Sequence, residues 1–368
     1  DAHAELEATL ARFFSEQTVM AEPAQCRFKA RFEWLRERLQ FDTARLPVQT
    51  CALHEEWMRN LDTTAIAAVF ASNDLNSPAT MYGHSLLRLD RRGQGPDDRL
   101  LAYAVNYAAS IAQGENMLTY TVLGISGGFA GQYSVYRYHE KVRQYARINN
   151  RDLWEYPLTL SEDEVRRVLW HLWEMRGVGS EYYFFTENCS YMLLALLQTA
   201  RPGLHLTRDF DWPGLYVIPV DTLRTLREAG MLDETAFRPS LARRLQHQLG
   251  QLDAEHEAWV IAATETGVDL DDPRYRDATP QEQARMLETA HDRLYFRFTE
   301  DDVRRKDALA TTRTLLATRS TLDVAADFTP VPTPATPPER GHETSRLAGG
   351  WRYDRSAHSS AAVLRFRG

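Results

Sequence analysis

The sequence predicts an α+β fold in which helical regions flank a small antiparallel sheet. Apolar residues recur at helical spacing near the N-terminus and again, with charged opposite faces, across residues 219–316. Between these regions, residues 84–89 and 100–109 show the short apolar runs that are typical of strands, and the polar, Gly-rich residues 90–98 join them as a hairpin. Helices segregated from a strand-rich centre are the pattern of an α+β protein.

The first third of the chain predicts helices followed by strands. Apolar stripes indicate one helix over residues 3–18 and two more over residues 29–40 and 51–61. The segment 64–89 has a mixed pattern, and Ser77-Pro78 interrupts it before the first clear strand begins at His84.

The remaining segments predict more strands, then helices, then an extended tail. Residues 120–138 are rich in Gly, Tyr and Val, which favours strands and tight loops. Ser161 to Glu164 form a capping box that opens a helix, and residues 189–200 form a strongly apolar one. Prolines crowd residues 330–338, which predicts a stiff linker. Residues 341–368 are strand-like, so we expect the start of a further domain there, with a frayed tail as the alternative.

Composition limits the class of protein. The chain has 368 residues, enough for two to three structural units, and 43% of them are apolar. Lys and Arg number 43 against 51 Asp and Glu, a net charge of −8, which argues against a nucleic-acid partner. No run of 18 apolar residues is present, so no transmembrane helix is expected. The chain begins with Asp1, and a removed signal peptide would explain this.

The three cysteines predict one disulfide and one free thiol. Cys26 and Cys51 are near neighbours, each beside a predicted helix, and in an exported protein they are the natural pair. Closing this loop stabilises the fold by about 3 kcal/mol in the chain-entropy model. The alternative is a pair of buried, reduced cysteines in a cytosolic protein.

The segment around Cys189 is the strongest candidate for chemistry. Polar residues precede it and an apolar helix follows it, so Cys189 falls in the first helical turn. The unpaired N–H groups and the helix dipole stabilise a thiolate there, and the same N–H groups are expected to hold an oxyanion. The alternative is a buried, inert cysteine.

A thiolate nucleophile needs a base and a group that orients the base. His84 is the expected base, because Gly83 permits a close backbone approach and a histidine at the start of a strand can face the N-terminus of a packed helix. Asn106 is the expected orienting group, because it is the only amide in the apolar run 103–107 on the neighbouring strand.

Other patterns are weaker. Residues 124–128 match the G-x-S-x-G nucleophile elbow, but the residues after them are a poor helix start, so a flexible or close-packed glycine loop is preferred. His54-Glu55 and His256-Glu257 lack the second histidine of a zinc helix. No phosphate-binding loop or dinucleotide fingerprint is present, and we expect neither a metal nor a cofactor.

Two blocks carry a resemblance to a known family. SPATMYGHSLLR at residues 77–88 and FFTENCS at residues 184–190 together resemble the Lnb N-terminal periplasmic domain family. The resemblance covers roughly residues 20 to 225. More distantly, the order of His before Asn-Cys is similar to that of circularly permuted, papain-like enzymes of the NlpC type and of lecithin retinol acyltransferase-like enzymes. Shorter matching blocks are Cys26-Arg27-Phe28, Tyr103 to Tyr107, Arg151 to Tyr156 and Val217 to Asp221.

This resemblance implies a fold, an activity and partners. It implies a small sheet packed on the Cys-bearing helix, and a periplasmic transacylase that moves a fatty acyl chain from a phospholipid, through a thioester, to the amino group of a bacterial lipoprotein or another amine. Cys189 would be the nucleophile and His84 the base. Some members continue into an outer-membrane β-barrel, which suits the strand-like end and implies a membrane surface as partner. The lipoprotein-acylating members lack such a barrel, which leaves the substrate of this chain open.

The predicted parts and site residues follow from these observations. Two rival functions stay open: a cell-wall peptidase or amidase of the NlpC type, and a non-catalytic periplasmic domain of an outer-membrane protein. The expected parts are an N-terminal helical region (1–62), a Cys-His thiol-enzyme core (63–225), a helical extension (226–325), a Pro-rich linker (326–346) and the start of a C-terminal domain (347–368). The residues expected to contact substrate are Tyr82, Ser85, Phe184, Phe185, Asn188 and Ser190.

Overall fold

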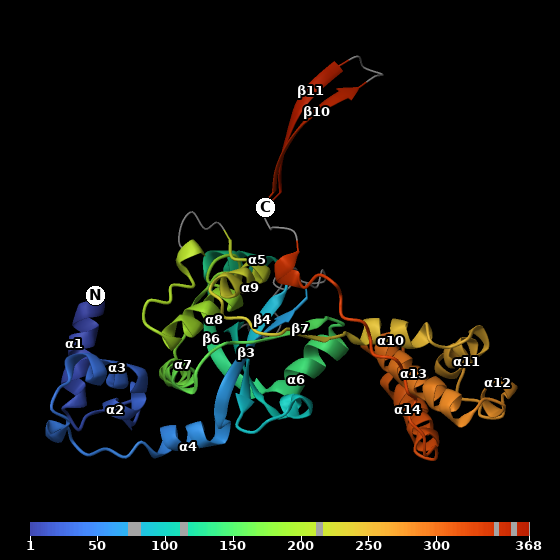
Figure 1. The fold of residues 1–368 in the computed structure, drawn as a ribbon, viewed down its shortest axis with the longest axis horizontal. Helices are drawn as coiled ribbons and strands as arrows, with labels where there is room; N and C mark the ends of the chain where they lie inside the picture. The colour runs from blue at the N-terminus through green and yellow to red at the C-terminus, as the bar shows by residue number, and fades with distance from the viewer. Residues whose placement is uncertain (73–81, 111–116, 211–215, 342–345, 355–358, 368) are drawn as a thin grey trace.

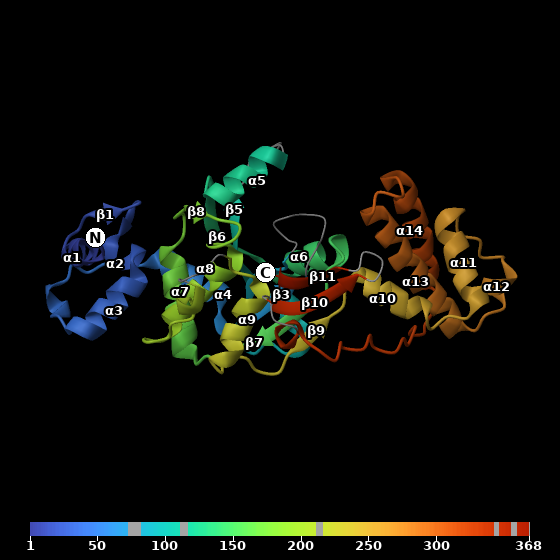
Figure 2. The same ribbon diagram turned by 90° about the horizontal axis from the view of Figure 1, so that it is seen from above.

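The chain arranges three groups of elements along its longest axis. The N-terminal helices, a central sheet and a second group of helices follow one another, and a pair of strands projects to one side (Figures 1 and 2). The arrangement confirms the predicted α+β class. The structure is a computed structural model that describes residues 1–72, 82–110, 117–210, 216–341, 346–354 and 359–367.

An antiparallel sheet forms the centre. Within the described residues it has seven strands, in the order β8-β6-β5-β4-β3-β7-β9. The register of β4 against β3 runs from His84 opposite Ala71 to Arg91 opposite Thr63, so His84 lies at one end of the sheet. The next strand, β5, carries Asn106 beside it. The strands are β3 (Thr63–Ala71), β4 (His84–Arg91), β5 (Tyr103–Ser110), β6 (Phe129–Arg137), β7 (Leu153–Pro157), β8 (Ser180–Tyr182) and β9 (Ala236–Arg238).

Helices cover both faces of this sheet. On one face, α7 (Glu162–Glu174), α8 (Cys189–Leu197) and α9 (Pro219–Glu228) share a buried apolar core with the strands. On the other face, α6 (Tyr138–Val142) and a π-helix (Arg143–Ile148) pack against a second cluster. The predicted capping box of α7 is present, since Ser161 and Glu164 exchange their hydrogen bonds.

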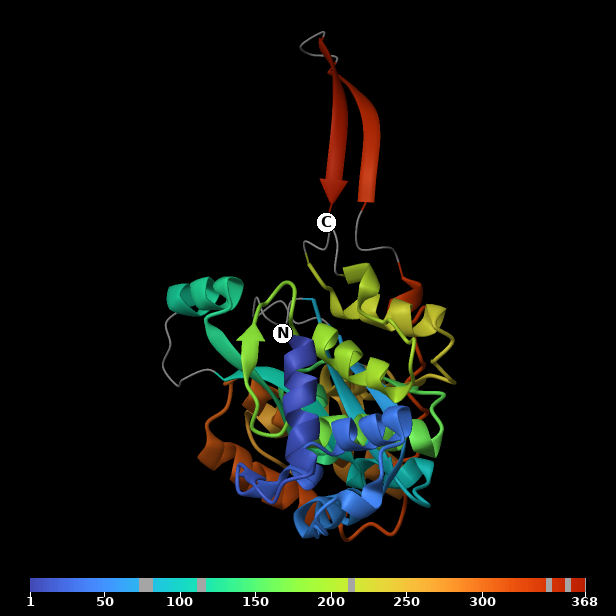
Figure 3. The same cartoon turned by 90° about the vertical axis from the view of Figure 1, so that its left-hand side faces the viewer.

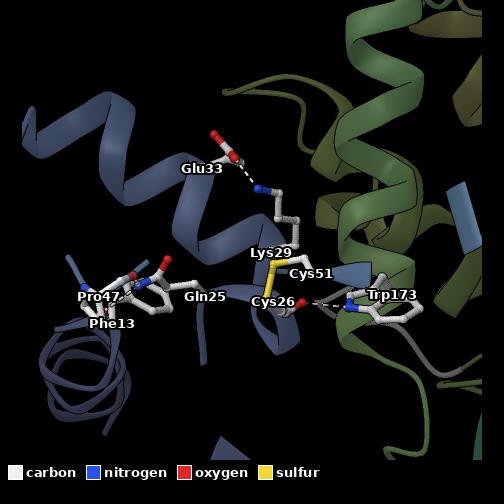
Figure 4. The surroundings of a disulfide bond; sticks show 8 residues. All are labelled: Phe13, Gln25, Cys26, Lys29, Glu33, Pro47, Cys51 and Trp173. Carbon is white, nitrogen blue, oxygen red and sulfur yellow. Dashed lines mark hydrogen bonds and ion pairs between the residues drawn. A yellow bond between two sulfur atoms is a disulfide. The ribbon is translucent and has the colours of Figure 1, made fainter. Parts of the chain in front are cut away.

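The N-terminal helices are fastened to α7. The predicted disulfide between Cys26 and Cys51 is present, and Trp173 Nε1 donates to the Cys26 carbonyl at 2.8 Å (Figure 4). The buried guanidinium of Arg27 donates to the carbonyls of Trp173 and Glu174 at the end of α7 and to that of Arg176 just beyond it. The elements of this region are α1 (Ala2–Phe13), β1 (Thr18–Val19), β2 (Glu22–Pro23), α2 (Ala24–Arg27), α3 (Lys29–Leu39) and α4 (Ala52–Leu61).

A second helical group follows the sheet and has its own apolar core. This group contacts the π-helix and the residues after it. Arg147 forms an ion pair with Asp292 at 4.0 Å, and Asn150 Nδ2 donates to Glu300 at 3.1 Å. The helices are α10 (Leu241–Leu249), α11 (Ala254–Glu265), α12 (Pro273–Arg276), α13 (Pro280–Thr299) and α14 (Arg305–Arg319).

The Pro-rich segment packs on the chain and does not lie free. Gln251 accepts from the backbone of Thr329 at 2.8 Å, and the buried Glu339 accepts from the Tyr156 hydroxyl on β7 at 2.6 Å. The strands β10 (Arg346–Asp354) and β11 (Ser359–Arg367) then pair as a hairpin that points away from the sheet (Figure 3).

One predicted segment has a different structure. Residues 120–126 were expected to contain strands and loops, but they lie in the helix α5 (Met117–Ser126). Packing overrides the β-propensity of the Tyr, Thr and Val residues here. Helix α5 packs against the Phe184 ring at Gly124, where a Cβ atom would come within 2.2 Å of the ring. Strand β6 begins only after Gly127, whose φ of +77° ends the helix. The first helix is also shorter than predicted, ending at Phe13.

Candidate active site

Helix α8 begins at a side-chain cap. Asn188 Oδ1 accepts from the backbone N–H groups of Ser190 and Tyr191 at 3.1 and 3.3 Å. Its Nδ2 donates to the carbonyls of Phe184 at 3.2 Å and Val217 at 2.7 Å. These four bonds use the whole capacity of an amide, so Asn188 shapes the helix start and has no bond to offer a substrate. The N–H groups of Ser190 and Tyr191 are likewise occupied, contrary to the oxyanion role expected of the first helical turn.

The structure brings His84 and Asn106 together. The Nε2 atom of His84 lies 2.7 Å from Oδ1 of Asn106, which is buried. Because an amide oxygen only accepts hydrogen bonds, Nε2 must carry a proton, and Nδ1 is the nitrogen that can accept the proton of the thiol. The close approach expected at Gly83 is confirmed, since its φ is +98° and a Cβ atom would come within 2.4 Å of the Phe70 ring.

Cys189 lies at the start of α8 and is the free thiol among the described residues. Burial raises the pKa of the thiol, but the charge of His84 and hydrogen bonds from the His84 side chain, the Ser85 backbone and the Ser190 hydroxyl outweigh it. Together they bring the pKa down to about 7. At neutral pH a large fraction of the sulfur is therefore thiolate, which is the nucleophilic form.

Two tyrosines that the sequence did not single out lie beside the thiol. Tyr182 directly precedes the aromatic block 183–185. Burial and the charge of Cys189 raise the pKa of its hydroxyl well above the usual value, although a hydrogen bond from the Cys189 backbone N–H acts in the opposite direction. Tyr145 comes from the π-helix, with its ring centroid 5.5 Å from that of His84. Burial and the charge of Cys189 raise the pKa of Tyr145 as well, so both hydroxyls stay protonated and can donate.

The other predicted contact residues divide into buried and exposed groups. Ser85 and Ser190 are buried next to the thiol, and the Ser85 hydroxyl has no hydrogen-bond partner among the described atoms. Phe184 packs into an aromatic cluster with Tyr182, at 5.9 Å between ring centroids. Tyr82 and Phe185 are about two-fifths exposed, at 41% and 42%. Residues 77–81 of the first family block lie outside the described residues.

Two weaker sequence patterns do not form sites. At residues 124–128 a helix precedes the glycines and a strand follows them, the reverse of a nucleophile elbow. His54 is buried against Trp173, at 5.3 Å between ring centroids. Among the residues that the structure describes, no group of three or more His, Cys, Asp or Glu side chains is arranged to hold a metal ion.

Comparison with known families decides what kind of domain carries this site. The model of the Lnb N-terminal periplasmic domain matches residues 54–229, which include His84, Asn106 and Cys189. Over this part, just under half of its length, the chain is similar to the Lnb N-terminal periplasmic domain family. The predicted resemblance is thereby confirmed, and with it a periplasmic type of domain.

The segments on either side of the Lnb-type domain match other family models. Residues 1–38 and 235–331 each match a domain of unknown function, DUF7843 and DUF7842 respectively. No curated protein and no solved structure matches the chain. None of the helices in the described ranges is long and apolar enough to cross a membrane.

Proposed function

We propose that the Lnb-type domain is a thiol acyltransferase in which Cys189 is the nucleophile, His84 the general base and Asn106 the residue that orients the base. The observation that carries the proposal is the 2.7 Å contact of Asn106 with His84 beside a thiol whose pKa falls to about 7. Nucleophile, base and orienting group are the three roles that covalent catalysis at a carbonyl requires. The burial of Cys189 fits a non-catalytic domain, but such a domain gives no reason for the lowered pKa.

The first step forms a thioester. His84 Nδ1 takes the proton of Cys189, and the sulfur attacks the carbonyl carbon of a lipid ester, with a phospholipid as the donor. The tetrahedral intermediate collapses as the carbon–oxygen bond breaks, and the leaving alcohol takes the proton back from His84. The acyl chain is then bound to Cys189 as a thioester.

The second step transfers the acyl chain. A primary amine, such as the N-terminus of a lipoprotein, attacks the thioester carbonyl and gives its proton to His84. The carbon–sulfur bond breaks, the thiolate leaves as the low pKa allows, and an amide is formed. Water in place of the amine would release a free fatty acid.

The negative oxygen of both intermediates needs hydrogen-bond donors. Asn188 occupies the next two N–H groups of α8, and the N–H of Cys189 is bonded to the Tyr182 oxygen. The hydroxyl of Tyr182 is therefore the first donor proposed for this oxygen. The hydroxyl of Tyr145, which is also protonated and whose ring lies close to His84, is the second. The aromatic side chains of Phe184 and Phe185 would accept the start of the acyl chain.

The location and acceptor are part of the same proposal. A periplasmic enzyme meets phospholipid and lipoproteins at a membrane surface, and the β10–β11 hairpin would be the start of an outer-membrane barrel that holds the domain there. The five parts of the chain that the sequence predicts remain a prediction and form part of this proposal.

Intact mass tests the thioester directly. The purified protein is incubated with vesicles of phosphatidylethanolamine and phosphatidylglycerol, beside Cys189→Ser, His84→Ala and Asn106→Ala. We expect a fatty-acyl mass on the parent that hydroxylamine removes, a hydroxylamine-resistant ester or no adduct on Cys189→Ser, and little adduct on His84→Ala. His139→Ala, an exposed histidine on α6, is the matched control and should acylate like the parent.

The rival functions give different results in the same experiment. An adduct that persists in full on His84→Ala would refute the proposed base. No adduct on any form, with release of peptides from peptidoglycan, would replace the transferase by an amidase. No adduct and no peptide release would leave a non-catalytic domain.

A further inference from the structure

Helix α5 is an exposed helix without a single charge. Its sequence, MLTYTVLGIS, contains no Asp, Glu, Lys or Arg, although these make up 26% of the whole chain. Val122 and Ile125, one turn apart, are 54% and 51% exposed. Two exposed apolar side chains on a helix that carries no charge make a face suited to an apolar neighbour outside the folded chain.

The opposite side of α5 is bound to the segment that leads to the nucleophile. The backbone N–H of Phe184 donates to the carbonyl of Gly124 at 2.8 Å, and the ring of Tyr120 lies 5.0 Å from that of Phe184. Five residues after Phe184 the chain reaches Cys189. The helix is therefore built into the wall of the site, with its exposed face turned outward.

Other exposed apolar side chains belong to the same end of the sheet. Phe185 follows the residue on which α5 rests, and Tyr82 stands two residues before His84. Both are about two-fifths exposed. The strand that carries His84 and the helix that carries Cys189 thus each begin within a few residues of an exposed aromatic ring.

The C-terminal hairpin leaves from this end as well. Figures 1 and 3 show α5 and the base of the β10–β11 hairpin at the same end of the molecule. The chain reaches that base from Glu339, which is held by the Tyr156 hydroxyl and by the guanidinium groups of Arg224 and Arg227 at its carbonyl. These bonds hold the chain against β7 and α9 up to the start of the hairpin segment.

We infer that the outer face of α5, formed by Val122 and Ile125, rests on a lipid surface and places the end of α8 that carries Cys189 against the lipid. This inference rests on the proposed acyl transfer and names the surface from which that reaction takes its lipid. An uncharged helix at the site accounts for how a buried thiol meets an ester that lies in a bilayer. A second copy of the chain is the other occupant that the test distinguishes.

Two double variants test the inference. Val122→Asp with Ile125→Asp puts two charges on the face, while Leu309→Asp with Leu316→Asp puts two charges on α14, at leucines that are 48% and 51% exposed. Binding is measured by flotation with phosphatidylethanolamine and phosphatidylglycerol vesicles. We expect the α5 variant to lose vesicle binding by about 10-fold or more, and the α14 variant to bind like the parent.

A soluble substrate separates this inference from the proposed function. Acylation of Cys189 by p-nitrophenyl butyrate, a water-soluble ester, should be equal in the parent and both variants, which also shows that the α5 variant is folded. Vesicle binding that survives in the α5 variant would overturn the inference. The inference would also be overturned if the parent did not bind vesicles and formed a dimer that the α5 variant did not form. Absence of any acyl adduct, with vesicle binding still lost in the α5 variant, would refute the acyl transfer and leave the lipid contact standing.

Discussion

Replacing His84 by alanine should raise the pKa of Cys189 from about 7 to above its ordinary value of 9.0, because the charge and the hydrogen bond of His84 are the largest causes that lower it. Burial, which opposes them, remains in the variant. At pH 7 the thiolate fraction falls from about one half to about one hundredth, roughly 50-fold. A thiolate of higher pKa is intrinsically more nucleophilic by about 8-fold over this interval, so the alkylation rate at pH 7 should fall only about 6-fold.

The assay is the rate of iodoacetamide alkylation of Cys189 against pH, followed by intact mass. The midpoint of the rate profile reports the pKa and does not depend on how accessible the sulfur is. We expect midpoints near 7 for the parent and for the control His139→Ala, and above 9 for His84→Ala. A midpoint near 7 in His84→Ala would refute the assigned thiol–imidazole pair, whatever the rate.

Three other predictions concern stability and are read from urea unfolding. Burial lowers the pKa of His54 from 6.5 to about 4. Between these two pH values only the unfolded state binds the proton, so the free energy of unfolding should be full above pH 6.5 and fall by about 3 kcal/mol towards pH 4. The variant His54→Phe should lack this part of the pH dependence. Cys26→Ser with Cys51→Ser should cost about 3 kcal/mol relative to the parent under oxidising conditions, and an equal stability would show that the bond is absent. Gly83→Ala should cost more stability than Gly93→Ala. Both glycines have positive φ, worth about 1–2 kcal/mol for alanine, but of the two only Gly83 has no room for a Cβ atom. Equal costs would contradict the close approach beside the strand that carries His84.

Much of the fold could be predicted because its signals are local. The capping box at Ser161 is present, as are the helix that begins at Cys189 and the strand that begins at His84. Each depends on residues within one or two turns of the chain. The helix α5 was missed because its Tyr, Thr and Val residues favour strands locally, and only packing on Phe184 selects a helix.

The site could be predicted in part. His84 and Asn106 were chosen from their places on neighbouring strands, and the register of β4 and β5 brings them within hydrogen-bond distance. Asn188 was expected at the substrate, but its four bonds to the chain give it a structural role. Tyr145 could not be found from sequence, because a tyrosine among charged residues carries no signal until the π-helix turns it towards His84.

Most helix and strand segments, the identity of the thiol and the two blocks of the Lnb-type domain can be read from the sequence, since these are properties of short stretches of chain. The groups that surround the thiol, the packing of the Pro-rich segment through Glu339 and the uncharged helix beside the site are visible only in the folded chain. They are visible only there because pKa values, hydrogen-bond partners and exposed faces depend on contacts between residues far apart in the chain. Such contacts have no local pattern.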